Sequence, residues 1–226
     1  MIDWMSVKGR RLPPDEAFGE PWEIIKQSNN SVSIRSVVSK WVGIQAERTI
    51  SLSPESAKII FNNRFTRIEP SEQRLQLWTV TQMVPPEWVL LDSHPNPGEP
   101  SFVNRRPQFD PLPYLKVNAE QNQVRYRQNT DGPNMIGTRG SWIAAIYDQH
   151  VVIHQIEPDH HADYATDVSV QLFTIKDFIE LETLSPDATP EVGESMSNTV
   201  RWHVLARPAE LSDDQLSDWI GEQMSR

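Results

Sequence analysis

Two glutamates on one predicted strand are the residues best suited to chemistry in this sequence. Within Asp177–Leu184 (DFIELETL), Glu180 and Glu182 alternate with apolar residues, which places both carboxylates on one face of a strand. Spacing alone favours a solvated face of an edge strand, but Gln171 of the preceding predicted strand lies beside them. Carboxylates and amides among aromatic rings are what a sugar site requires, because they bind hydroxyl groups while the rings stack on C–H faces.

Histidines form the second group of candidate residues. Four of the six lie in His150–His161, among several carboxylates. His150 and His154 share one face of a predicted strand about 13 Å apart, too far for two ligands of one metal ion unless the chain bends. His160 lies in the following loop, where a histidine and a carboxylate can meet to bind a metal ion. Adjacent histidines in polar loops are commonly just solvated, and such loose motif matches are frequently false. The sequence therefore predicts no metal site.

The composition excludes several classes of function. The chain has 226 residues, with 21 lysines and arginines against 31 aspartates and glutamates, and a net charge of −10. Such an acidic protein is unsuited to the phosphate backbone of nucleic acids. The absence of cysteine removes thiolate metal sites, disulfides and cysteine nucleophiles, and with only 9 glycines there is no phosphate-binding loop motif. We therefore expect no cofactor and no nucleic-acid partner.

Membrane and export signals are not visible in the sequence. No apolar run approaches the ~18 residues that a membrane span needs, so no membrane partner is expected. Residues Met1–Arg10 lack a basic segment followed by an apolar core, the pattern of a signal peptide. The sequence thus predicts a cytoplasmic protein.

Alternating apolar and polar residues predict β-strands through most of the chain. The predicted strands are Ser31–Val38, Gly43–Leu52, Lys58–Ile68, Arg74–Met83, Tyr114–Val117, Gln123–Arg127, Trp142–Tyr147, His150–Ile156, Asp167–Thr174, Asp177–Thr183 and Ser197–Leu205. We expect Ala57–Met83 to be an antiparallel pair with a hairpin loop at Glu69–Glu72. A capping box at Ser212 and Gln215 predicts a short amphipathic helix that ends near Met224. The fold class is therefore all-β and antiparallel, in one domain over 1–226 with its core at 20–207 and a helical tail at 208–226.

A proline-rich stretch interrupts this pattern at Val84–Pro113. Proline cannot donate to a strand ladder and breaks helices, so we predict a long loop without a central strand. Trp88, Phe102 and Phe109 are costly to leave in water, at about 1.5–3 kcal/mol each. We expect them to hold the loop against the fold, where it covers one side of the sugar site.

The segment Leu181-Glu182-Thr183…Pro186-Asp187-Ala188 resembles one found in aldose 1-epimerases, also called galactose mutarotases. The wider pattern, including Gly140–Ala144, Val168–Thr174 and Gly193–Trp202, resembles an uncharacterised bacterial branch of that superfamily over about residues 20–207. The resemblance implies an antiparallel supersandwich, two large sheets packed face to face, with a carbohydrate cleft. It also implies that family strands normally preceding Lys8–Glu23 are lacking here, as in a shortened member, a fragment or a protein whose start lies upstream.

The resemblance carries a mechanism as well. In the family, a glutamate takes the proton of the anomeric hydroxyl while a histidine protonates the ring oxygen, so the sugar ring opens and closes again. Glu182 matches the glutamate. The family histidine aligns near Leu77–Val84, where this sequence has no histidine.

The candidate site follows from these two lines of reasoning. Glu182 is the candidate base, and His154 and His160 are the candidate acids. The candidate sugar-binding residues are Trp78, Gln82, Glu180 and Trp142.

Three functions remain open at this point. The first is a mutarotase-like protein that binds a small sugar or a glycan. The second is an active aldose epimerase in which a histidine from 150–161 supplies the missing acid. The third is a structural or interaction β-sandwich whose glutamates are only solvated, since a fold does not determine a function.

Overall fold

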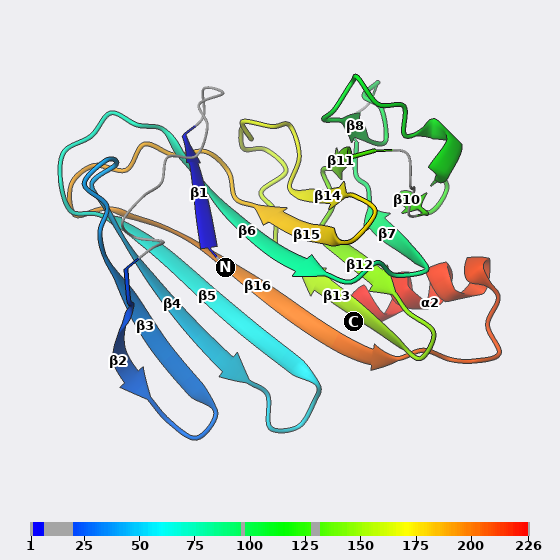
Figure 1. Ribbon diagram of the computed structural model, residues 1–226, viewed down its shortest axis with the longest axis horizontal. Helices are drawn as coiled ribbons and strands as arrows, with labels where there is room; N and C mark the ends of the chain where they lie inside the picture. The colour runs from blue at the N-terminus through cyan, green and yellow to red at the C-terminus, as the bar shows by residue number, and fades with distance from the viewer. Residues whose placement is uncertain (1, 7–19, 96–97, 128–131, 226) are drawn as a thin grey trace.

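The computed structural model describes residues 2–6, 20–95, 98–127 and 132–225. They form two antiparallel β-sheets, with one α-helix near the C-terminus (Figure 1). The six-stranded sheet has the order β1 (Ile2–Ser6), β6 (Leu75–Met83), β15 (Ile179–Leu184), β14 (Val170–Thr174), β11 (Asn134–Thr138) and β8 (Val103–Asn104). The ten-stranded sheet has the order β2 (Glu23–Gln27), β3 (Ser31–Val38), β4 (Ile44–Leu52), β5 (Lys58–Arg67), β16 (Ser195–Ala206), β13 (His150–Gln155), β12 (Trp142–Ile146), β7 (Trp88–Asp92), β10 (Gln123–Tyr126) and β9 (Leu115–Asn118). The predicted all-β antiparallel sandwich is confirmed.

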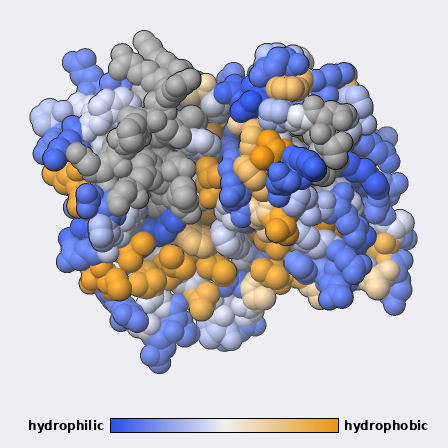
Figure 2. Space-filling view, in the orientation of Figure 1, coloured by the Kyte–Doolittle hydropathy of each residue, from blue (hydrophilic) through white to orange (hydrophobic). Residues whose placement is uncertain are grey.

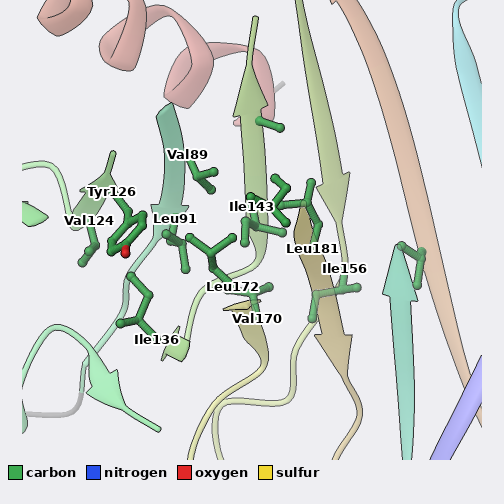
Figure 3. Packing of buried hydrophobic residues seen from close by; sticks show 13 residues of the cluster. Val89, Leu91, Val124, Tyr126, Ile136, Ile143, Ile156, Val170, Leu172 and Leu181 are labelled. Atoms are coloured by element: carbon green, nitrogen blue, oxygen red, sulfur yellow. The ribbon is translucent and has the colours of Figure 1, made fainter. Parts of the chain in front are cut away.

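The main hydrophobic core lies between the two sheets (Figure 3). It is built by alternate residues of each strand, because successive side chains of a strand point to opposite faces. The six-stranded sheet contributes Ile136, Val170, Leu172, Ile179 and Leu181, and the ten-stranded sheet contributes Val89, Leu91, Val124, Tyr126, Ile143, Ala145 and Val200. In the strands of the six-stranded sheet, the residues that alternate with these core positions, including Gln171 and Glu182, therefore lie on the outer face of that sheet.

The predicted pairing of β5 with β6 is wrong. β5 pairs with β4 and β16, whereas β6 pairs with β1 and β15 in the other sheet. The segment between them crosses from one sheet to the other instead of making a hairpin. Arg67, at the end of β5 and 1% exposed, donates to the backbone carbonyls of Val42, Gln73 and Pro190 and so holds this crossing.

The prediction that the proline-rich stretch lacks a central strand is also wrong. β7 lies inside that stretch and is an interior strand, paired with both β10 and β12. Its residues Trp88–Asp92 contain no proline, and the prolines flank the strand, where they remove no ladder hydrogen bond. The stretch also contributes β8 and a short 3₁₀ helix, Leu112–Tyr114.

The predicted C-terminal helix is α2 (Asp213–Met224), and its capping box is present. The Ser212 side chain accepts from the backbone N–H of Gln215, and the Gln215 side chain accepts from the backbone N–H of Ser212. Leu216 and Ile220 of α2 pack on the outer face of the ten-stranded sheet, against the cluster that contains Trp142. This helix therefore covers the side of the sandwich opposite to the six-stranded sheet.

Part of the ten-stranded sheet is not covered by other described residues. Figure 2 shows apolar surface gathered at the lower left, where β2–β5 extend beyond the six-stranded sheet. Exposed apolar side chains of these strands include Ile24 and Leu52, which are 61% and 54% exposed. Among the helices in the described residues, none is long and apolar enough to cross a membrane.

Candidate functional site

Glu182 of β15 lies on the outer face of the six-stranded sheet and is 0% exposed. Its Oε2 atom accepts a hydrogen bond of 2.9 Å from the indole Nε1 of Trp78, on the neighbouring strand β6. The same oxygen accepts a hydrogen bond from Nε2 of Gln171, which lies directly opposite Glu182 on β14. Two donors from the flanking strands therefore fix the position of the carboxylate.

A second row of polar and aromatic side chains crosses the same face two residues further along β15. Glu180 lies opposite Gln82 of β6 and opposite Phe173 of β14. Oε1 of Glu180 accepts a hydrogen bond of 3.2 Å from Nε2 of Gln82. Gln82 is exposed, and Glu180 and Phe173 are half-buried. This row offers a carboxylate and an amide to a ligand without any movement of the fold, beside the Phe173 ring.

One end of this face is covered by the loop that connects β13 to β14. Tyr164 and Val168 of the loop pack with Leu184 and Trp78 in a small apolar cluster. Burial raises the pKa of the Tyr164 hydroxyl, so it stays protonated at neutral pH. A cavity of about 210 Å³ opens at this end, lined by Tyr164, Leu184 and Ser185 together with Asn198 of β16.

The other end of the face carries arginine. The guanidinium of Arg106, which follows β8, lies 5.1 Å from the centroid of the Phe173 ring. Phe178 packs against the same ring, with centroids 6.1 Å apart. Phe173 is therefore held between a cation and a second aromatic ring.

Two residues predicted for the site lie elsewhere. Trp142 is on the outer face of the ten-stranded sheet, 5% exposed beneath α2, so the core of the sandwich separates it from Glu182. His154 is also on the ten-stranded sheet, 1% exposed and stacked on Trp202 with ring centroids 4.5 Å apart. Burial lowers the pKa of His154 to about 3, so this histidine is neutral at physiological pH.

His160 lies in the exposed loop after β13, edge-on to His94 with ring centroids 5.8 Å apart. His94 is not among the residues predicted for the site. Its Nε2 lies 3.1 Å from Oδ1 of Asp92, and Oδ2 of Asp92 accepts 2.6 Å hydrogen bonds from the backbone N–H and the hydroxyl of Ser141. The sequence signal for this pair is that Asp92 stands two residues before His94 at the end of an apolar run. Across the described part of the chain, no group of three or more histidine, cysteine, aspartate or glutamate side chains is placed to hold a metal ion.

Comparison with known proteins identifies the fold. No protein-family model matches the chain, and no curated protein matches its sequence. The structure of a galactose mutarotase-like protein from Lactobacillus casei is similar with a TM-score of 0.57 at 11% identity, over 81% of this chain and 72% of that one. A galactose mutarotase related enzyme from Lactobacillus acidophilus gives a TM-score of 0.53 at 8% identity, over 85% of this chain and 74% of that one.

Identities this low show a shared fold and say nothing about shared activity. They do confirm, at the level of the fold, the resemblance seen in the sequence. The chain has the fold of the galactose mutarotase-like proteins.

Proposed function

We propose that this protein binds a carbohydrate on the outer face of its six-stranded sheet, around Glu182. The observation that carries the proposal is a buried carboxylate held by two side-chain donors, Trp78 and Gln171. Burying a carboxylate is costly unless it is hydrogen-bonded, and a face that served packing alone would have an apolar residue there. The alternative of a merely solvated glutamate does not fit a side chain that is 0% exposed.

The chemistry of the face suits hydroxyl groups. Glu180 and Gln82 offer acceptors and donors for pairs of sugar hydroxyls. A ligand reaches Glu182 itself only after the side chains that cover it move, whereas Glu180 and Gln82 are already accessible. The ligand we propose is therefore a small sugar, or one residue of a glycan, that is anchored on the Glu180 row.

Mutarotation is a second candidate function, favoured by the carboxylate of Glu182. It needs an acid as well as a base. The two groups that hold Glu182 are an indole and an amide, and neither supplies a proton near neutral pH. His154 is stacked within the ten-stranded sheet, so an acid would have to come from the loop that carries His160.

Binding is tested by titrating the protein with glucose and galactose and following backbone amide signals by NMR. We expect saturable shifts in the amides of β6, β14 and β15. The variants Glu180→Gln and Glu182→Gln keep the shape of each side chain, and we expect weaker binding in both. Glu222→Gln, an exposed residue of α2, is the matched control and should bind as the unchanged protein does. Shifts confined to other strands would overturn the proposed site.

Catalysis is tested separately by following the interconversion of sugar anomers with polarimetry. An active epimerase should accelerate the exchange and lose this activity in Glu182→Gln, even at sugar concentrations that saturate the variant. A protein that binds sugar but leaves the rate of exchange unchanged is a binding protein rather than an epimerase.

A further inference from the structure

Two arginine side chains beside the candidate site make no ion pair and no hydrogen bond within the described part of the chain. Among the arginines that the structure describes, all others make a side-chain hydrogen bond or an ion pair. The guanidinium groups of Arg105 and Arg106 make neither with the described residues, although the chain has ten more acidic than basic side chains. Such unpaired cations on an acidic protein call for a physical explanation.

The loop that carries Arg106 is rigidly built. The backbone N–H of Arg106 donates to Oδ1 of Asn104 at 2.9 Å, and Nδ2 of Asn104 donates to the carbonyl of Phe109 at 3.0 Å. The backbone N–H of Phe109 donates in turn to the carbonyl of Arg106 at 2.9 Å. The backbone N–H of Arg105 donates to the carbonyl of Met135 on β11 at 2.8 Å, which continues the β8 pairing. The arginines therefore extend from a fixed backbone.

The guanidinium of Arg106 is also oriented by its side-chain packing. It lies over the ring of Phe173 at 5.1 Å from the centroid. A guanidinium over a ring can keep N–H donors for another partner, and paired guanidinium donors match the two oxygens of a carboxylate or a phosphate. Little side-chain entropy remains to be lost when an anion binds, because the ring already restricts the side chain.

Phe173, the ring under Arg106, lies close enough to Glu182 for a substituted sugar to reach both. Phe173 is on the strand next to Glu182 and two residues along from its direct partner Gln171. Strand spacing of about 4.8 Å and a rise of about 3.3 Å per residue put the Cα atoms of Phe173 and Glu182 about 8 Å apart. Glu180 lies directly opposite Phe173 on the same face and would repel an anion, whereas the two arginines attract one.

We propose that the ligand of this face is an anionic sugar, whose carboxylate or phosphate is bound by Arg106 with Arg105 beside it. The inference rests on the proposed carbohydrate function and names its substrate class. The sugar ring occupies the Glu180 row, and the anionic substituent points along β14 toward the loop after β8. A carboxylate on the sugar carbon chain and a phosphate ester present the same oxygen geometry to a guanidinium, so the test includes both.

The test is isothermal titration calorimetry with glucose, glucuronate and glucose 6-phosphate at low ionic strength. We expect at least one of the two anionic sugars to bind about tenfold or more tightly than glucose, and this gain to fall as salt is added. The variant Arg106→Gln should abolish the gain, so that the anionic sugars bind no more tightly than glucose does to the same variant. Arg106→Lys should retain part of it, because an ammonium keeps the charge but loses the paired donors.

Arg64→Gln is the matched control, since Arg64 is an exposed arginine of the ten-stranded sheet that donates to Ser195. Its affinities should not change. Equal affinity for all three sugars, or a gain that survives Arg106→Gln, overturns the inference and leaves the carbohydrate site standing. A gain that depends on Arg106 but is indifferent to Glu180→Gln and Glu182→Gln supports the anion site and overturns the proposed sugar site. Absence of binding by all three sugars overturns both.

Discussion

The indole Nε1 of Trp78 and Oε2 of Glu182 are joined by a 2.9 Å hydrogen bond between adjacent strands of the six-stranded sheet. Trp78 lies opposite Leu184 and Glu182 opposite Val80, so the bond runs diagonally across the β6–β15 pair. Diagonal neighbours on one face are within reach of a long side chain such as tryptophan. The bond ties the apolar cluster under the β13–β14 loop to the buried carboxylate.

Trp78→Phe should weaken this arrangement, because the ring remains while the donor is lost. Hydrogen bonds to charged groups contribute about 1.5–3 kcal/mol, so we expect the free energy of unfolding to fall by about 1–2 kcal/mol in urea titrations. Trp219→Phe is the control, as Trp219 is also half-buried and its indole N–H makes no hydrogen bond within the described residues. Equal losses in the two variants would contradict a specific role for the donor.

Arg67 supports a different part of the fold, the crossing from β5 to the six-stranded sheet. Arg67→Met removes donors from three backbone carbonyls and leaves them buried, and burial already lowers the pKa of this guanidinium. An unsatisfied buried polar group costs about 1–3 kcal/mol, so we expect a loss of roughly 3 kcal/mol or more in the free energy of unfolding. Arg64→Met on the same strand is exposed, and a comparable loss there would argue against this explanation.

The difference between these two regions shows what sequence patterns can predict. Alternation in β15 correctly places Glu180 and Glu182 on one face, because the period of a strand is a local property. The pairing of β14 with β15 follows from a short link between them. Whether β5 and β6 pair or part depends on contacts between distant segments, such as those of Arg67 with the carbonyls of Val42 and Pro190, and no local pattern reveals them.

The same contrast between local patterns and tertiary contacts holds for β7 and for the residues of the candidate site. β7 contains no proline, but the many prolines on either side of it led to the prediction of a loop there. Trp142 has the composition of a sugar-binding residue, but α2 covers it, and helix docking is a tertiary event. Arg106 carries no motif and becomes visible only when Phe173 is placed beneath it.

His154 should make stability depend on pH. Its pKa is lowered from 6.5 to about 3 in the folded protein because burial disfavours the charged ring. Between these values the unfolded chain binds the extra proton, so the free energy of unfolding rises with pH, by up to ~1.4 kcal/mol per pH unit from this residue. Stability is therefore lost as pH falls from about 6.5 toward about 3.

Urea titrations from about pH 4 to about pH 7, across most of the interval between the two pKa values, measure this dependence. His154→Phe preserves an aromatic ring against Trp202 and removes the titrating group, so its slope with pH should be smaller. The lowered pKa of His203 acts in the same direction in both proteins and cancels in the comparison. His161→Gln, an exposed change, should leave the slope as it is, and an identical slope in His154→Phe would refute the assignment.

Gly137 tests how the β13–β14 loop packs over the site. Gly137 lies opposite Gln171 on β14, and a Cβ atom added there would lie 2.8 Å and 2.9 Å from the two γ carbons of Val168. Overpacking of this kind costs typically about 1–3 kcal/mol, so we expect Gly137→Ala to lower the free energy of unfolding by that amount.

The double variant Gly137→Ala with Val168→Ala decides whether that contact is the cause. Removing the γ carbons of Val168 makes room for the new methyl group, so the double variant should be more stable than the sum of the single changes predicts. Val168→Ala alone measures the cost of the emptied space in the cluster with Tyr164 and Leu184. Because the loop buries Trp78 in the same cluster, Gly137→Ala should also weaken sugar binding in the NMR titration, and the double variant should restore it. Strict additivity of the two changes would show that Val168 does not pack on Gly137 in solution.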